Sequence, residues 1–104
     1  MVSAPKNIQL SITFRGIEST PAIKSHAEEK ISAVLKKFIH HDTEARLILQ
    51  VQKKEQIAEL QFHADGADFH CKEIRDDLYA AIDALVATAA NQLRKHKEKI
   101  TAHH

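Results

Sequence analysis

AELQFHADGADFHC, residues 58–71, is the stretch that decides the fold. Apolar and polar residues alternate on both sides of Asp65-Gly66, which is the period-two pattern of half-buried β-strands. Asp-Gly is a favoured two-residue hairpin turn because both central positions can take positive φ. With such a turn Phe62 lies opposite Phe69, so both strands direct their apolar residues to the same face. The stretch therefore predicts an antiparallel hairpin with one apolar side.

Two further strands are predicted before the hairpin. Apolar residues alternate with polar ones from Ile8 to Phe14, and Gly16 ends this strand. A shorter alternation from Leu47 to Val51 marks the next strand. The chain therefore contributes four strands in all.

Two amphipathic helices complete the pattern. The first is predicted from about 21 to 39, with Thr20 as its N-cap and Pro21 at the first helical position, where no amide donor is needed. The second is predicted from about 77 to 100, with Asp76 or Asp77 as its cap. Each has one apolar stripe at three- and four-residue spacings: Ile23, Ala27, Ile31, Val34 and Phe38 in the first, and Leu78, Ile82, Leu85, Ala89, Leu93 and Ile100 in the second.

The element order is βαβββα, which predicts an α+β fold. We expect a two-layer sandwich in which a four-stranded mixed sheet carries both helices on one face. The first helix makes a crossover, so the strands before and after it are expected to be parallel neighbours, and the rest forms an antiparallel meander. The 104 residues fit one domain, spanning 1–104.

Charge is distributed unevenly along the chain, although the formal net charge is only +1. Residues 1–41 carry six Lys or Arg and three acidic residues, whereas residues 42–69 carry three and six. Residues 91–104 carry four bases and one acid. The net charge argues against a strongly basic nucleic-acid binder. The end of the second helix, however, carries more cations than are needed to complement its dipole, and this excess favours phosphate contacts.

Several classes of protein are not expected. A single cysteine, Cys71, cannot form an internal disulfide and fits a reducing cytosol. No apolar run approaches the ~20 residues that span a bilayer, and the N-terminus lacks a signal-peptide pattern, so a cytoplasmic protein without membrane contact is expected. The sequence has no Gly-rich phosphate loop and no nucleophile motif, so we expect no enzyme, no cofactor and no small-molecule substrate.

The eight histidines raise the question of a metal site. His63 and His70 are predicted to be diagonal neighbours on the outer face of the sheet, near Glu59 and Asp68, and two histidines with a carboxylate can bind zinc. Exposed strands often carry such residues without a metal, and no spacing matches a known site, so no metal ligand is predicted. His103 and His104 follow the last predicted helix.

Tyr79 is the only tyrosine of the chain. We expect its ring to pack under the start of the second helix with the hydroxyl at the rim, as amphipathic aromatic side chains often do. The alternative is that it shapes a binding surface.

The segment Asp77-Leu78-Tyr79-Ala80-Ala81-Ile82-Asp83 resembles Asp-Met-Tyr-Ala-Ala-Ile-Asp at the start of the final helix in the ribosome hibernation-promoting factors and the related ribosome-associated inhibitor. Further similar segments are the basic helix end at 92–99, the helix start at 20–23 and the hairpin at 63–66. The resemblance spans nearly the whole chain in the same order. It is to the short form of the family, without the long form's dimerisation domain or the inhibitor's acidic tail.

The resemblance implies a protein that binds the small ribosomal subunit where messenger and transfer RNA would sit. It implies inhibition of translation by occupancy in stationary or starved cells, and formation of inactive ribosome dimers together with a second small factor. The residues that it implies for binding rRNA phosphates, including two that add charge nearby (Lys37 and Arg94), are Lys24, Lys30, Lys37, Arg94, Lys95, Lys97 and Lys99.

The basic pattern of the family is incomplete in this chain. Ala33, Thr88 and Asn91 stand where relatives usually carry Lys or Arg, and each missing phosphate contact should weaken binding and its salt dependence. Lys36, Lys37 and Lys72 are the residues that could compensate.

Two other functions remain open. One is a protein–protein modulator of an alternative sigma factor, because related sequences have been labelled so and a near-neutral charge suits a protein partner. The other is a general binder of double-stranded RNA. Salt dependence separates an RNA complex from an apolar protein complex, and selectivity for intact subunits separates a ribosome factor from a duplex binder.

Overall fold

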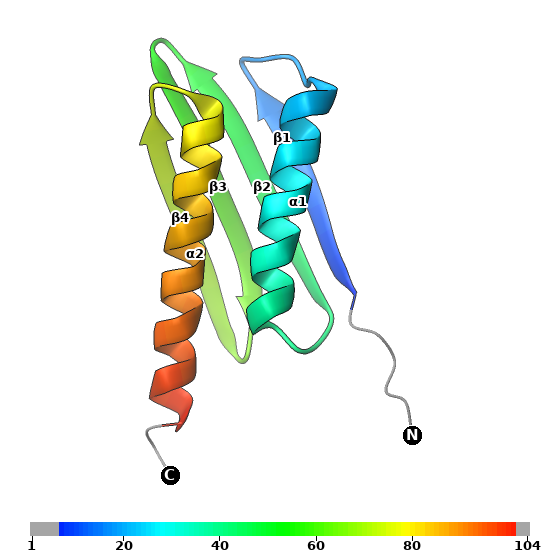
Figure 1. The fold of residues 1–104 in the computed structure, drawn as a ribbon, viewed down its shortest axis with the longest axis vertical. Helices are drawn as coiled ribbons and strands as arrows, with labels where there is room; N and C mark the ends of the chain where they lie inside the picture. Colours follow the sequence, from blue (N-terminus) through cyan, green and yellow to red (C-terminus); the bar gives the residue numbers. More distant parts are fainter. Residues whose placement is uncertain (1–6, 102–104) are drawn as a thin grey trace.

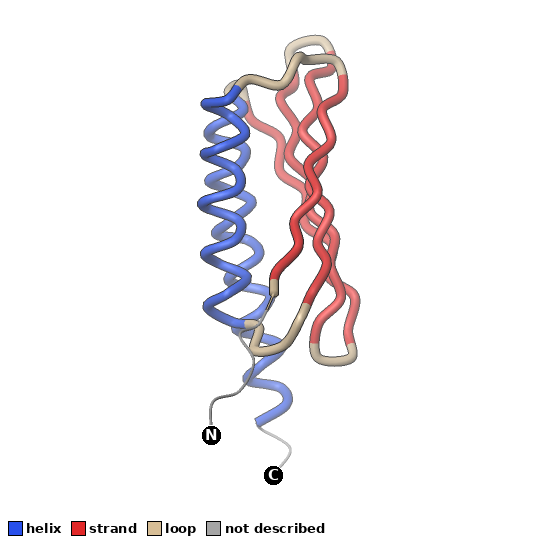
Figure 2. The backbone as a smooth tube through the Cα atoms, turned by 90° about the vertical axis from the view of Figure 1, so that its right-hand side faces the viewer, coloured by secondary structure: helices blue, strands red, loops and turns tan. Residues whose placement is uncertain are grey.

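The computed structural model describes residues 7–101. Its elements follow the predicted order: β1 (Ile8–Arg15), α1 (Pro21–Phe38), β2 (Thr43–Gln52), β3 (Glu55–Ala64), β4 (Ala67–Arg75) and α2 (Leu78–Thr101). The strands form a sheet in the order β1-β2-β3-β4, with β1 parallel to β2 and the other neighbours antiparallel. Both helices cover the same face of this sheet, so the predicted two-layer α+β sandwich is confirmed (Figures 1 and 2).

The β3–β4 hairpin has the predicted register. Phe62 is paired with Phe69, and their rings stack with centroids 4.8 Å apart. Asp65 has φ 52° and Gly66 has φ 78°, as a turn with two positive-φ positions requires. The Asp-Gly pair therefore fixes which side of each strand faces the helices.

Both helix starts are capped by side chains. The Ile23 amide donates to Thr20 Oγ1 at 3.2 Å, and the Ala80 amide donates to Asp77 Oδ2 at 3.1 Å. Of the two predicted caps of the second helix, Asp77 is therefore the one used. Helix α1 ends at Phe38, one residue before the predicted end.

The core lies between the helices and the inner face of the sheet. The predicted stripe of α1 is buried except for Phe38, which is half-buried, and that of α2 is buried throughout its described part. Cys71 also faces the core, as predicted, and is 2% exposed. The side chain of Ile100, together with His103 and His104, lies outside the described residues. Neither described helix is long and apolar enough to cross a lipid bilayer.

The turn between β1 and α1 lies tightly against β2. Gly16 has φ 71°, and a Cβ at this position would clash with the carbonyl oxygen of Val51. Position 16 therefore accepts no side chain unless the backbone moves. This close approach lies at the end of the parallel β1–β2 pair where α1 begins.

Candidate nucleic-acid interface

The two helices bring cationic side chains to one end of the molecule. Helices α1 and α2 run in the same direction, so their C-terminal ends lie together, beside the loop at 39–42 and the β3–β4 turn (Figures 1 and 2). Six cations on the last turns of both helices form what we call the basic end: Lys36, Lys37, Arg94, Lys95, Lys97 and Lys99. All six are exposed.

The seven residues predicted to bind phosphate are all exposed, but they do not form a single cluster. Five belong to the basic end, Lys30 lies in the middle of α1, and Lys24 lies in its first turn, at the opposite end. Lys30 and Lys37 follow His26 by four and eleven positions, so these three residues share one stripe of the helix. This stripe borders α2, because His26 contacts Asp83.

The first half of the two helices is joined by a polar contact. His26 Nε2 lies 2.9 Å from Asp83 Oδ1, and the Tyr79 ring meets the His26 ring edge-on with centroids 5.0 Å apart. Tyr79 is 36% exposed. The expectation that its ring packs under the helix start was therefore wrong: the ring contacts His26 of α1, and the side chain is partly exposed.

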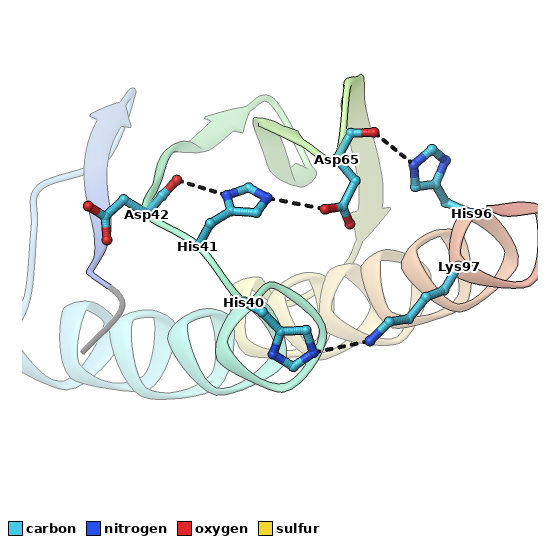
Figure 3. Close-up of polar contacts among 6 residues, drawn as sticks. All are labelled: His40, His41, Asp42, Asp65, His96 and Lys97. Atoms are coloured by element: carbon cyan, nitrogen blue, oxygen red, sulfur yellow. Dashed lines mark hydrogen bonds and ion pairs between the residues drawn. The ribbon is translucent and has the colours of Figure 1, made fainter. Parts of the chain in front are cut away.

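Histidines connect the segments that meet at the basic end (Figure 3). Lys97 Nζ donates to His40 Nε2 at 3.1 Å, and His41 Nε2 lies 3.2 Å from Asp65 Oδ1. His96 Nε2 lies 3.3 Å from the Asp65 carbonyl oxygen. The α1–β2 loop, the β3–β4 turn and the end of α2 are thereby held together.

The fold raises the pKa of His41. A hydrogen bond to the Asp42 carbonyl, 3.1 Å from Nδ1, and then the Asp65 carboxylate raise the pKa of His41 above its usual 6.5. His40 and His41 are not among the residues predicted to act at this site. Their position directly after a lysine-rich helix end could have suggested a role. The neighbouring sequence does not show which segments their side chains contact.

The three positions that depart from the basic pattern have different surroundings. Ala33 and Asn91 are exposed on their helices. Thr88 is half-buried, and its hydroxyl donates to Glu73 Oε2 at 2.7 Å, so this side chain links α2 to β4. Lys72, one of the residues suggested to compensate, follows the inward-facing Cys71 and points to the sheet face that the helices leave open, away from the other suggested residues, Lys36 and Lys37.

The open face of the sheet is polar and of mixed charge. His63 Nδ1 lies 2.7 Å from Asp68 Oδ1, and His70 pairs with Glu59. Strand residues of both signs, Arg46 among them, line a shallow hollow of about 810 Å³ here. Within residues 7–101 no group of three His, Cys, Asp or Glu side chains is arranged to hold a metal ion.

The family model described as "Sigma 54 modulation protein / S30EA ribosomal protein" matches residues 10–101. The chain belongs to this family. A curated relative, the ribosome hibernation promoting factor of Klebsiella oxytoca, is 38% identical over 96 residues, which are 92% of this chain and 100% of the relative. The protein of the same name from Azotobacter vinelandii is 36% identical over 92 residues, which are 88% of this chain and 85% of the relative. The resemblance to the hibernation-promoting factors is thus confirmed.

Two solved structures have the same fold. The N-terminal domain of Thermus thermophilus Protein Y superposes with a TM-score of 0.75 and 30% identity, covering 86% of this chain and 98% of that chain. A ribosomal subunit interface protein from Coxiella burnetii superposes with a TM-score of 0.77 and the same coverage. At 22% identity the second match supports the fold alone.

Proposed function

We propose that this protein binds the small ribosomal subunit through its basic end and the adjoining helix stripes. It thereby occupies space that messenger and transfer RNA need, and it favours inactive ribosome dimers in starved or stationary cells, with a second small factor as partner. The observation that carries this proposal is the convergence of cations from two distant parts of the chain. His40 and Lys97, which meet here, are 57 positions apart. The names of the curated relatives support the same partner.

The chemistry of the basic end suits phosphates more than base edges. One or two cations would complement the negative ends of the two helices, and the remaining charges are available to rRNA oxygens. Flexible lysines on helices that pack against a rigid sheet anchor and orient the protein on rRNA without reading the base sequence. Inhibition then requires only that the protein occupies the site, without any chemical step. Such a protein acts in the cytoplasm, where ribosomes work.

The test is co-sedimentation with ribosomes on sucrose gradients at low and moderate salt. Replacing Lys30, Lys95, Lys97 and Lys99 together with Ala should abolish comigration with the small subunit at moderate salt while leaving the circular dichroism of the fold unchanged. The slope of log affinity against log salt should become shallower by up to about 3.6, because four lysines are removed and each phosphate contact contributes about 0.7–0.9.

A matched variant controls for total charge. Arg15, Arg46, Lys54 and Lys72 are exposed and lie away from the basic end, so their joint replacement with Ala removes the same charge. This control should bind as the wild type does. Equal losses from both variants, or a wild-type protein that stays at the top of the gradient even at low salt, would overturn the proposal.

A second candidate is modulation of a sigma factor, which the description of the family favours. The near-neutral net charge of +1 suits a protein partner. A complex of that kind, held by apolar contacts, should persist as salt rises, whereas an rRNA complex should dissociate. Competition by arbitrary duplex RNA as strong as that by intact subunits would instead indicate a general duplex binder.

A further inference from the structure

Three histidines lie among the cations of the basic end. His40 and His41 are exposed in the loop after α1, and His96 is half-buried on α2 (Figure 3). Histidine is the side chain that gains a positive charge within the range of about pH 8 to 5. The number of cations that the basic end presents therefore depends on pH.

We infer that the basic end takes up protons on His40, His41 and His96 when it binds RNA phosphates, so that mild acidification strengthens its hold on the ribosome. The inference rests on the proposed function and adds a mode of regulation to the same site. Its basis is the contact that each histidine makes.

His40 is held in a contact that only its neutral form can make. Lys97 Nζ is 3.1 Å from His40 Nε2, and an ammonium group has donors but no lone pair. The ring nitrogen must therefore accept, which a protonated imidazole cannot do. Protonation replaces this hydrogen bond with two adjacent cations, and a phosphate placed between them relieves the repulsion.

His41 has acceptors at both ring nitrogens. The Asp42 carbonyl lies 3.1 Å from Nδ1 and the Asp65 carboxylate 3.2 Å from Nε2, and only the protonated ring donates to both. These contacts raise the pKa of His41, so its contribution to stability is full below the ordinary value of 6.5 and is lost as the pH rises through the higher value in the folded protein. The loop thus stays attached to the turn in acid, while the contact of His40 is lost.

His96 can be protonated without losing its contacts. Nε2 lies 3.3 Å from the Asp65 carbonyl oxygen, which only accepts, and the ring meets Phe69 edge-on with centroids 5.3 Å apart. The ring nitrogen facing that carbonyl is thus a donor in either protonation state, and the extra proton goes to Nδ1. The charge appears on a side chain that is already oriented.

The surrounding charges explain why proton uptake is coupled to binding. Those on the elements that meet here are Lys36 and Lys37 of α1, Asp42 of the loop, Asp65 of the turn, and Arg94, Lys95, Lys97, Glu98 and Lys99 of α2, whereas His63 and Asp68 of the hairpin lie on the open face of the sheet. Cations outnumber acids in this group. A bound polyanion adds negative charge beside the three rings, and negative charge favours the protonated form of an imidazole. By reciprocity, the effect of RNA on protonation equals the effect of protonation on RNA affinity.

The experiment measures the affinity for purified small ribosomal subunits at pH 7.8 and 6.2 at constant ionic strength. The wild type should bind about fivefold more tightly at pH 6.2, or better, which is the upper range for one exposed charge pair. A variant with His40→Gln, His41→Gln and His96→Gln keeps polar groups near the ring nitrogens but does not titrate. It should bind within about twofold of the wild type at pH 7.8, since each solvent-exposed contact that it loses contributes little. It should not show the gain in affinity at pH 6.2.

Two further measurements separate the outcomes. The matched control, His63→Gln with His70→Gln on the open sheet face, should keep the full gain. His40→Gln alone, which leaves the contacts of His41 and His96 intact, should lose part of it even if the triple variant does not fold. Equal wild-type affinity at both pH values, or a full gain in the triple variant, would overturn the inference and leave the proposed function standing. Absence of small-subunit binding at either pH would overturn both.

Discussion

Cys71 shows at the scale of one residue how the fold suppresses reactivity. Its side chain points from β4 into the core, and its Sγ donates to Gln92 Oε1 of α2 at 3.5 Å. Burial, and to a lesser extent the charge of Glu73, raises the pKa of the thiol to about 11. The thiolate is the reactive form of cysteine and is scarce at neutral pH with such a pKa. Cys71 is therefore a packing residue and a poor nucleophile.

Alkylation by iodoacetamide tests this assignment. At pH 7.5 native Cys71 should react about 100-fold more slowly than in the urea-unfolded chain, because the thiolate fraction falls tenfold for each unit of pKa. Mass spectrometry of timed samples gives both rates, and the unfolded chain is the internal reference. Equal rates would mean that the side chain leaves the core readily.

At the scale of one element, α1 depends on its first turn. Its apolar stripe packs on the sheet, but the amides at the start of the helix need acceptors, and Thr20 Oγ1 supplies one to Ile23. Pro21 removes the need for another. The position of Lys24 and Lys30 on the surface follows from where this turn begins.

Thr20→Ala should lower the free energy of unfolding by about 1 kcal/mol, because the helix loses its capping oxygen. Thr20→Ser should retain most of the stability. Urea denaturation followed by circular dichroism measures both variants. Ser25→Ala deletes an exposed hydroxyl from the same helix and should be neutral or slightly stabilising. A Thr20→Ala variant as stable as the wild type would show that the cap contributes nothing.

At the scale of the whole molecule, the helices and strands could be predicted from the sequence, but the contacts between them could not. Asp65-Gly66 and Thr20-Pro21 act within a few residues, so local pattern identifies the turn and the helix start. Whether Lys24 joins the other cations depends on the direction of α1 relative to α2, which no short segment encodes. The partners of His26 and His40 lie 57 positions away. The surroundings of Tyr79 were wrongly predicted for the same reason, since its neighbour, His26, belongs to the other helix.

Restoring charge to the helix surface should improve binding. Ala33 lies on the stripe of Lys30 and Lys37, and Asn91 precedes Lys95 by one helical turn, so lysines at both positions add phosphate contacts without disturbing the core. The joint variant should bind small subunits more tightly and steepen the salt slope by about 1.4–1.8. Gel filtration at several salt concentrations, or filter binding, measures the effect.

Lysines at Gln9 and Gln61, exposed on the open sheet face, add the same charge as a control. They should leave the slope nearly unchanged. An equal gain from both pairs would show that affinity responds to net charge and that no particular surface is used.

The order of the elements along the chain has a consequence for how this protein is made. The basic end needs both helices, but α2 follows all four strands, and the sheet is complete at Arg75, well before Arg94 is synthesised. A nascent chain that has extruded the sheet therefore exposes the inner faces of β3 and β4 and presents only Lys36 and Lys37 of the six cations of the basic end. Synthesis from the N-terminus thus delays completion of the basic end until the final packing step. Under the proposed function, a ribosome translating this message would meet its own inhibitor only after α2 has emerged and folded.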